Sequence, residues 1–153
     1  MKNTVAKFKR GSAALAALCL ATSATFGADD TWTGNGDNNA KWNDPGNWDN
    51  AMESGGDFVF EKKADIAFDD AYTVSDRTIR FDGKPGPVTF TANNDTCGIT
   101  AANFYVGWGW AGELGITNGT YTVTERLAIG MQNSNNQYGT LRVSGGSLTA
   151  KPK

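Results

Sequence analysis

Hydrophobic and polar residues alternate with a period of two in several segments after residue 56. The alternation is clearest in Asp57-Phe-Val-Phe60, Asp65-Ile-Ala-Phe68, Thr78-Ile-Arg-Phe81 and Val88-Thr-Phe-Thr91, each followed by charged or turn-forming residues. Side chains of a strand point alternately to its two faces, so this period is typical of half-buried strands. After residue 28 no segment repeats apolar residues at helical spacing. The pattern predicts an all-β protein of short strands and tight turns.

The C-terminal third contains two segments that resemble each other. Phe104-Tyr-Val-Gly107 and Gly112–Val123 correspond to Leu127-Ala-Ile-Gly130 and Gly139–Ala150. The equivalent residues are Phe104 and Leu127, Val106 and Ile129, and Gly107 and Gly130, then Leu114 and Leu141, Ile116 and Val143, and Gly119 and Gly146. The offset between copies grows after Gly107, where Trp108–Ala111 is replaced by the longer Met131–Tyr138. The extra residues therefore fall at a corner between strands.

Each copy predicts three short strands with one buried face. The residues expected to point inward are Phe104, Val106, Leu114, Ile116, Tyr121 and Val123, and those expected to point outward are Tyr105, Thr120 and Thr122. One copy alone cannot bury its apolar face, whereas stacked copies share a continuous core. The repeat thus predicts a right-handed parallel β-solenoid in which Leu114 lies against Leu141. The alternative is an antiparallel β-sandwich or meander.

The first 28 residues have the pattern of a secretory signal peptide. Four basic residues, Lys2, Lys7, Lys9 and Arg10, precede an apolar run from Ala13 to Ala21. The run is too short to span a bilayer, and the small residues after it predict cleavage after Gly27 or Ala28. We therefore expect residues 29–100 to form a cap and irregular first coils, residues 101–153 to form regular coils, and the protein to be secreted or exposed at the cell surface.

The mature chain is acidic and has one cysteine. It retains ten basic and 16 acidic residues, a net charge of −6, and its basic residues are scattered. Nucleic-acid binders gather lysine and arginine into a patch, so a nucleic-acid partner is disfavoured. No later apolar stretch approaches the ~20 residues of a membrane-spanning helix. Cys97 has no histidine to activate it, because the chain contains none, and we expect it to be buried.

Three tryptophans, Trp32, Trp42 and Trp48, stand among asparagine, aspartate and glycine just after the signal peptide. Two interpretations are open: a solvent-facing strip of indoles for binding sugars, and a structural cap that covers the first coil. The position before the first strands favours the cap, with the polar residues forming the turns that bring the indoles together. This hypothesis predicts that all three indoles are buried.

Both ends of the mature sequence resemble secreted bacterial autotransporter-type passenger proteins, which contain the autotransporter-associated β-strand repeat. The matching residues are Trp32-Thr-Gly34, Trp42 and Asn47-Trp48, and then Leu127–Gly130 with Gly139–Thr149. The resemblance covers most of residues 31–150 and implies a β-solenoid outside the cell. Such proteins are usually longer and end in an outer-membrane barrel or an anchor, whereas this sequence stops at Lys153. We therefore expect a truncated product, a fragment, or a chain that associates end to end through an uncapped last coil.

Catalytic and metal-binding patterns are weak. Polysaccharide hydrolysis needs a pair of carboxylates, but Asp65, Asp69, Asp70 and Asp76 show no recognisable pairing and are expected in turns and on solvated faces. Calcium is the other candidate, because Asn35, Asp37 and Asn39 alternate oxygen ligands. An EF-hand loop starting at Asn35 would need glycine and glutamate where Ala40 and Gly46 stand. We expect no enzyme activity and no cofactor; the alternatives are a weak, irregular calcium site and a polysaccharide lyase or hydrolase.

Trp108 and Trp110 are the candidate ligand-binding residues. They flank Gly109 in a corner loop, and in an extended loop both would project from one side, where aromatic faces can stack on sugar rings. The alternative is that one or both fold back over apolar surface. The sequence favours a non-enzymatic structural or adhesive passenger that contacts glycans or cell-surface molecules. The alternative function is a polysaccharide-binding or polysaccharide-degrading module.

Overall fold

The computed structural model describes residues 27–38, 40–52, 55–82, 87–130 and 138–151. Its one helical element in these ranges is a short 3-10 helix, η1 (Pro45–Asn47). Its strands are β1 (Asp30–Thr31), β2 (Phe58–Phe60), β3 (Ala64–Phe68), β4 (Ala71–Phe81), β5 (Val88–Ala92), β6 (Gly98–Val106), β7 (Gly112–Ile116), β8 (Thr120–Ile129), β9 (Gly139–Val143) and β10 (Ser147–Ala150).

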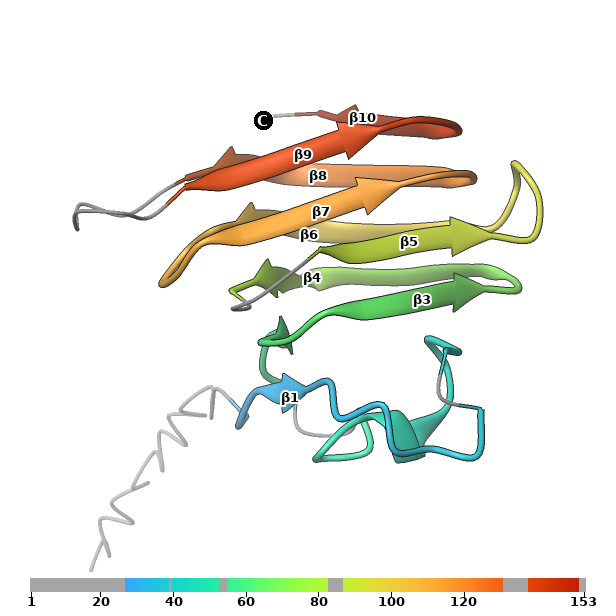
Figure 1. Ribbon diagram of the computed structural model, residues 1–153, viewed down its shortest axis with the longest axis vertical. Helices are drawn as coiled ribbons and strands as arrows, with labels where there is room; N and C mark the ends of the chain where they lie inside the picture. Colours follow the sequence, from blue (N-terminus) through green and yellow to red (C-terminus); the bar gives the residue numbers. More distant parts are fainter. Residues whose placement is uncertain (1–26, 39, 53–54, 83–86, 131–137, 152–153) are drawn as a thin grey trace, which may run out of the picture.

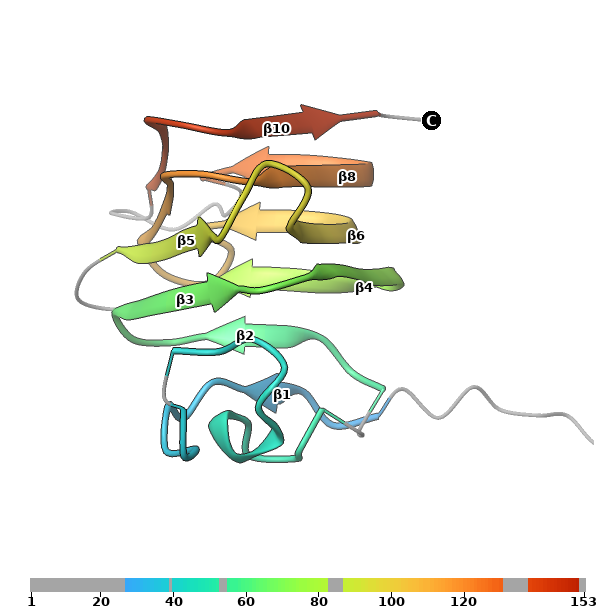
Figure 2. The same ribbon diagram turned by 90° about the vertical axis from the view of Figure 1, so that its right-hand side faces the viewer.

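These strands form a right-handed parallel β-solenoid of about four turns. One sheet has the order β1-β2-β4-β6-β8-β10 and the other the order β3-β5-β7-β9, so successive strands alternate between the sheets. All pairs of strands within the two sheets are parallel. Figures 1 and 2 show the coils rising from the blue N-terminal end to the red C-terminal end. The predicted fold is confirmed, and the sandwich alternative is not.

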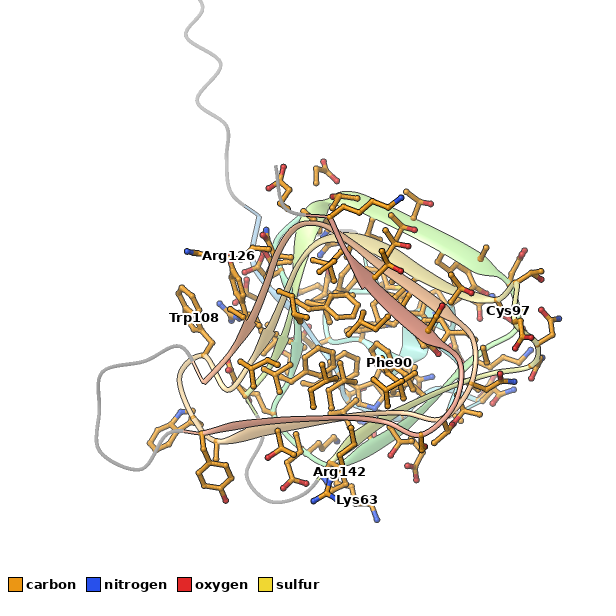
Figure 3. All side chains as sticks on the ribbon, turned by 90° about the horizontal axis from the view of Figure 1, so that it is seen from above. Lys63, Phe90, Cys97, Trp108, Arg126 and Arg142 are labelled. Atoms are coloured by element: carbon orange, nitrogen blue, oxygen red, sulfur yellow. The ribbon has the colours of Figure 1, made fainter. Side chains whose placement is uncertain are left out.

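Each coil has three sides, because the long strands of the first sheet bend. Pairing of β4 with β6 shifts register between Val74 and Thr78, and pairing of β6 with β8 shifts between Ala101 and Asn103. A bulge adds residues to one strand and bends it. The view along the solenoid in Figure 3 has a three-cornered outline with Phe90 in the interior. Strand β8 therefore supplies two sides of its coil and β7 the third.

The inward side chains stack in the register that the repeat predicts. Leu114 pairs with Leu141, Phe104 with Leu127, and Val106 with Ile129. All six residues expected to point inward are at most 1% exposed, whereas Tyr105, Thr120 and Thr122 are partly or fully exposed. The alternation of buried and exposed residues does not hold in β2, whose three residues are all buried. The boundary expected at residue 100 falls inside β6, and β2 to β5 already pair in register with their neighbours.

The three N-terminal tryptophans are buried, as the cap hypothesis predicts. Trp32, Trp42 and Trp48 are 4%, 1% and 4% exposed. Trp48 lies edge-on between the other two indoles, with ring centroids 5.0 Å from Trp32 and 4.9 Å from Trp42. Trp42 in turn stacks on Phe68 of β3 at 5.5 Å. The indoles therefore extend the aromatic core beyond the first coil and do not form a solvent-facing strip.

Asparagine and aspartate hold the cap loop in shape. The buried Asn47 side chain donates to the carbonyls of Asn38 and Lys41 and accepts from the Gly36 N–H. Asp44 caps η1 by accepting from the Gly46 N–H. These side-chain bonds satisfy backbone groups that no strand partner reaches. The predicted role of the polar residues as turn formers is confirmed at these positions.

Ion pairs connect the chain beside the cap to the first coils. Asp30 of β1 is fully buried and pairs with Arg77 of β4, whose guanidinium also lies 3.6 Å from the centre of the Phe58 ring. Arg80 of β4 pairs with Asp29 at 2.6 Å. Removing one partner of a buried pair leaves an uncompensated charge, which costs several kcal/mol. The segment directly after the predicted cleavage site is thus part of the folded unit.

Burial decreases toward the C-terminal end. Strands β9 and β10 are the last strands of their sheets and contain no fully buried residue. Ile129 and Val143 are 45% and 49% exposed, whereas their partners Val106 and Ile116 in the preceding coil are buried. The four extra corner residues of the second copy fall largely in 131–137, outside the described residues. End-to-end association through this coil stays a prediction.

Candidate functional site

Trp108 begins the corner between β6 and β7, and its indole lies flat on Tyr105. The two ring centroids are 4.7 Å apart with an interplanar angle of 17°. Gly107 has φ +80°, a conformation that glycine adopts without strain, and it turns the chain at the end of β6. Tyr105 points outward from β6, so Trp108 covers part of that outer face. Figure 3 shows Trp108 outside the core at one of the corners.

Asp82 holds this corner from the coil below. Its Oδ1 atom accepts the backbone N–H groups of Trp108 and Gly109 at 2.9 and 3.1 Å. Its other oxygen lies 3.7 Å from Arg80, which is the neighbour of Tyr105 across the sheet. A carboxylate that binds two successive N–H groups fixes the loop that they belong to. The aromatic stack is therefore positioned by a polar network rather than by burial alone.

Trp110 differs from Trp108 in its exposure. It is 55% exposed, and Tyr138 at the same corner of the next coil is 59% exposed. The Tyr138 carbonyl accepts the Gly112 N–H, which connects the two coils at this corner. The loop is bent rather than extended, and the two indoles are placed differently, as in the alternative in which one of them folds back. Trp108 folds back onto Tyr105, and Trp110 presents its surface to solvent.

A row of four threonines crosses the outer surface of the larger sheet. Thr73, Thr100, Thr122 and Thr149 lie in register on β4, β6, β8 and β10. The outer two are exposed and the inner two are partly exposed. Adjacent strands are ~4.8 Å apart, so the hydroxyl-bearing side chains repeat at about that spacing. We call these four residues the threonine row.

The acidic residues considered for catalysis lie in turns and on solvated faces. Asp69 and Asp70 form the turn between β3 and β4, where Asp70 accepts the N–H of Ala71. Asp69 accepts from Lys41 at 2.7 Å and from Tyr72 at 2.5 Å. These hydrogen bonds lower the pKa of Asp69, and the bond from Lys41 has the larger effect. Asp65 and Asp76 are exposed, as expected for residues on solvated faces.

The alternating oxygen pattern considered for calcium is part of the cap loop. Asn35 and Asp37 are exposed, and Asn39 lies outside the described residues. The neighbouring Asn38 uses its backbone, donating to Asp44 and accepting from Asn47. Within the described ranges, no three histidine, cysteine, aspartate or glutamate side chains are grouped to hold a metal ion.

Cys97 is buried, as predicted, and carries a free thiol. It lies in the turn before β6, and Figure 3 shows it at a corner of the coil away from Trp108. Tyr121 of β8 is fully buried, and burial raises the pKa of its phenol. Both groups contribute to the core.

The sequence identified the two corner tryptophans but not the residues that hold them. The sequence predicts Tyr105 on the outer face, but a spacing of three residues from Trp108 does not indicate a stack. Asp82 lies 26 residues before Trp108, close to the length of one coil. Asp82 could have been found by looking, for each corner, for an acidic residue about one coil earlier in the sequence.

Comparison with protein-family models, curated proteins and solved structures found no match for this chain. In the described part of the chain, no helix has the length and apolar character needed to cross a bilayer.

Proposed function

We propose that this chain is a secreted or surface-exposed, non-enzymatic β-solenoid with a structural or adhesive role. The observation that carries the proposal is the threonine row, which repeats one hydroxyl-bearing residue per coil on a stacked core. Repeated weak contacts along one rigid molecule add up, because each bound group raises the effective concentration of the next. The signal-peptide pattern and the resemblance to passenger repeats support secretion.

The test changes the two central threonines of the row. Lysine at Thr100 and Thr122 places long charged side chains across the row without altering the core. The matched control places lysine at Thr89 and Thr140, which are partly exposed on the other sheet. The mature chain is measured for retention on immobilised cellulose, chitin, mucin and collagen.

We expect saturable retention on at least one of these surfaces, lost in Thr100→Lys/Thr122→Lys and kept in Thr89→Lys/Thr140→Lys. Retention that is equal in the two double variants, or absent from all four surfaces with folded protein, contradicts an adhesive role of the threonine row.

A second candidate function is polysaccharide binding at the corner of Trp108 and Trp110. The exposed indole of Trp110 beside an aromatic stack held by Asp82 favours it. A glycan array separates the candidates. Binding that is abolished by Trp108→Ala and by Trp110→Ala supports the polysaccharide-binding module. The absence of binding to every glycan on the array favours the structural role.

A further inference from the structure

An open cavity of about 570 Å³ lies where the N-terminal cap meets the segment before β3. Trp32, Thr33 and Gly34 line it from the cap, and Lys62 and Lys63 line it from the segment between β2 and β3. The volume is within the ~300–1,000 Å³ of small-molecule sites. None of these residues belongs to the threonine row or to the corner of Trp108, so the cavity is a separate feature of the molecule.

A buried indole supplies an accessible N–H donor to this cavity. Trp32 is 4% exposed and packs against Trp48 and Phe60. Trp48 donates its indole N–H to the Trp42 carbonyl, whereas the Trp32 N–H has no hydrogen-bond partner among the described residues. The Trp32 N–H is not sealed from solvent, unlike the fully buried polar atoms that have no partner. An unpartnered N–H that solvent can reach is available to donate to a ligand.

Gly34 keeps the space in front of that donor open. It has φ +64°, and a Cβ atom at this position would lie 3.1 Å from Trp32 Nε1. The Trp32 N–H edge therefore lies beside a residue that lines the cavity, with no side chain between them. This places the donor on the cavity wall rather than within the core.

The part of the lining that comes from the segment between β2 and β3 is basic. Lys62 and Lys63 are both exposed, and the Lys62 ammonium donates to the Thr33 carbonyl at 2.5 Å, which holds it beside the cap. Figure 3 shows Lys63 extending outward from the coil. Asp65 adds one carboxylate to the lining, and Ala40 and Ala64 add apolar surface. The cavity thus combines cationic ammonium groups, one carboxylate that can accept a hydrogen bond, and apolar surface.

We propose that this cavity binds a carboxylate-bearing sugar, such as the hexuronate unit of an acidic polysaccharide. The ammonium groups of Lys62 and Lys63 pair with the carboxylate, the Trp32 N–H donates to a sugar oxygen, and Asp65 accepts from a hydroxyl. The volume is larger than a simple inorganic anion needs, and the apolar lining suits a sugar ring. The proposal does not depend on the threonine row, so each is tested separately.

The test is a titration of the 15N-labelled mature chain with D-glucuronate, followed by the indole N–H signals. Trp32→Phe removes the N–H and identifies the Trp32 signal by its disappearance. We expect this signal to shift saturably in the wild type and to shift little with D-glucose. Lys62→Gln/Lys63→Gln removes both charges and weakens binding by about tenfold or more, equivalent to ~1.4 kcal/mol. Lys151→Gln, an exposed lysine near the other end of the chain, leaves binding unchanged.

Three results overturn the proposal. One is the absence of any glucuronate-dependent shift of the Trp32 signal in folded protein. Another is a glucuronate affinity that is equal in the wild type and Lys62→Gln/Lys63→Gln. The third is D-glucose binding as tightly as D-glucuronate. The lysine variants change exposed side chains, so they keep the test decisive even where Trp32→Phe fails to fold.

Discussion

At the scale of single residues, Trp42 is the centre of the aromatic core under the cap. Its ring centroid lies 4.9 Å from the ring centroids of Trp48 and Phe58 and 5.5 Å from that of Phe68, and its side chain is 1% exposed. Trp42→Ala removes these contacts and leaves a cavity. We expect a loss of about 3–5 kcal/mol in the free energy of unfolding, measured by chemical denaturation.

Trp110→Ala is the matched control, because Trp110 is 55% exposed. The same truncation there should change the free energy of unfolding by about 0.5 kcal/mol or less. Equal losses in the two variants would show that the cap indoles do not stabilise the fold through burial.

Gly98 is a second residue whose identity follows from geometry. It has φ +144°, and a Cβ atom there would lie 2.0 Å from the carbonyl oxygen of Thr120 on the next coil. Gly98→Ala therefore forces the backbone of β6 away from β8, and we expect a loss of at least ~2 kcal/mol. Gly109 has open space around it, so Gly109→Ala is a mild control. Thermal unfolding of both variants measures the difference, and similar transition temperatures would contradict the account.

At the scale of elements, the sequence predicted the strands better than their bends. Inward residues such as Phe104 and Leu114 follow from parity, because each strand needs only its own two-residue period. Parity is lost where β4 bulges between Val74 and Thr78, and Arg77 lies in that bulge. Its partner Asp30 is 47 residues away, so their ion pair depends on coil stacking that no local pattern contains. The stack of Trp108 on Tyr105 was missed for a local reason: the chain turns at Gly107, which has φ +80°, so the two-residue period does not continue from Tyr105 to Trp108.

The attachment of the cap to the first coil should depend on pH. Asp69, in the turn before β4, accepts hydrogen bonds from Lys41 of the cap loop and from Tyr72, and these lower its pKa below the ordinary value of 3.8. A carboxylate with a lowered pKa stabilises the folded state above the pKa of the unfolded chain. That contribution is lost as pH falls through the folded-state pKa.

Asp69→Asn should therefore cost about 1 kcal/mol or less at neutral pH, since the pair is partly exposed. The difference between wild type and variant should shrink as the pH falls below about 4. Denaturation at pH 7, 5 and 3 measures it. A difference that stays constant down to pH 3 would mean that the carboxylate charge is not what attaches the cap.

At the scale of the whole molecule, the two ends of the solenoid differ. The N-terminal end is covered by three buried indoles and is connected by ion pairs to β4, whereas Ile129 and Val143 near the other end are about half exposed. In a solenoid each coil is stabilised mainly by its neighbours. A coil with a neighbour on one side only is therefore less stable than a coil between two others.

Amide hydrogen exchange should follow this gradient. Strand β6 lies between β4 and β8 and most of its residues are buried, so its amides should exchange slowly, through opening of several coils together. Strands β9 and β10 pair on one side only, and their amides should exchange first. Mass spectrometry of peptides from residues 98–106 and 139–150 measures the two rates in one sample.

Equal protection in both peptides would mean that the coils open as one unit or that another surface covers the last coil. Protein dilution separates these two cases, because only the second loses protection as the concentration falls.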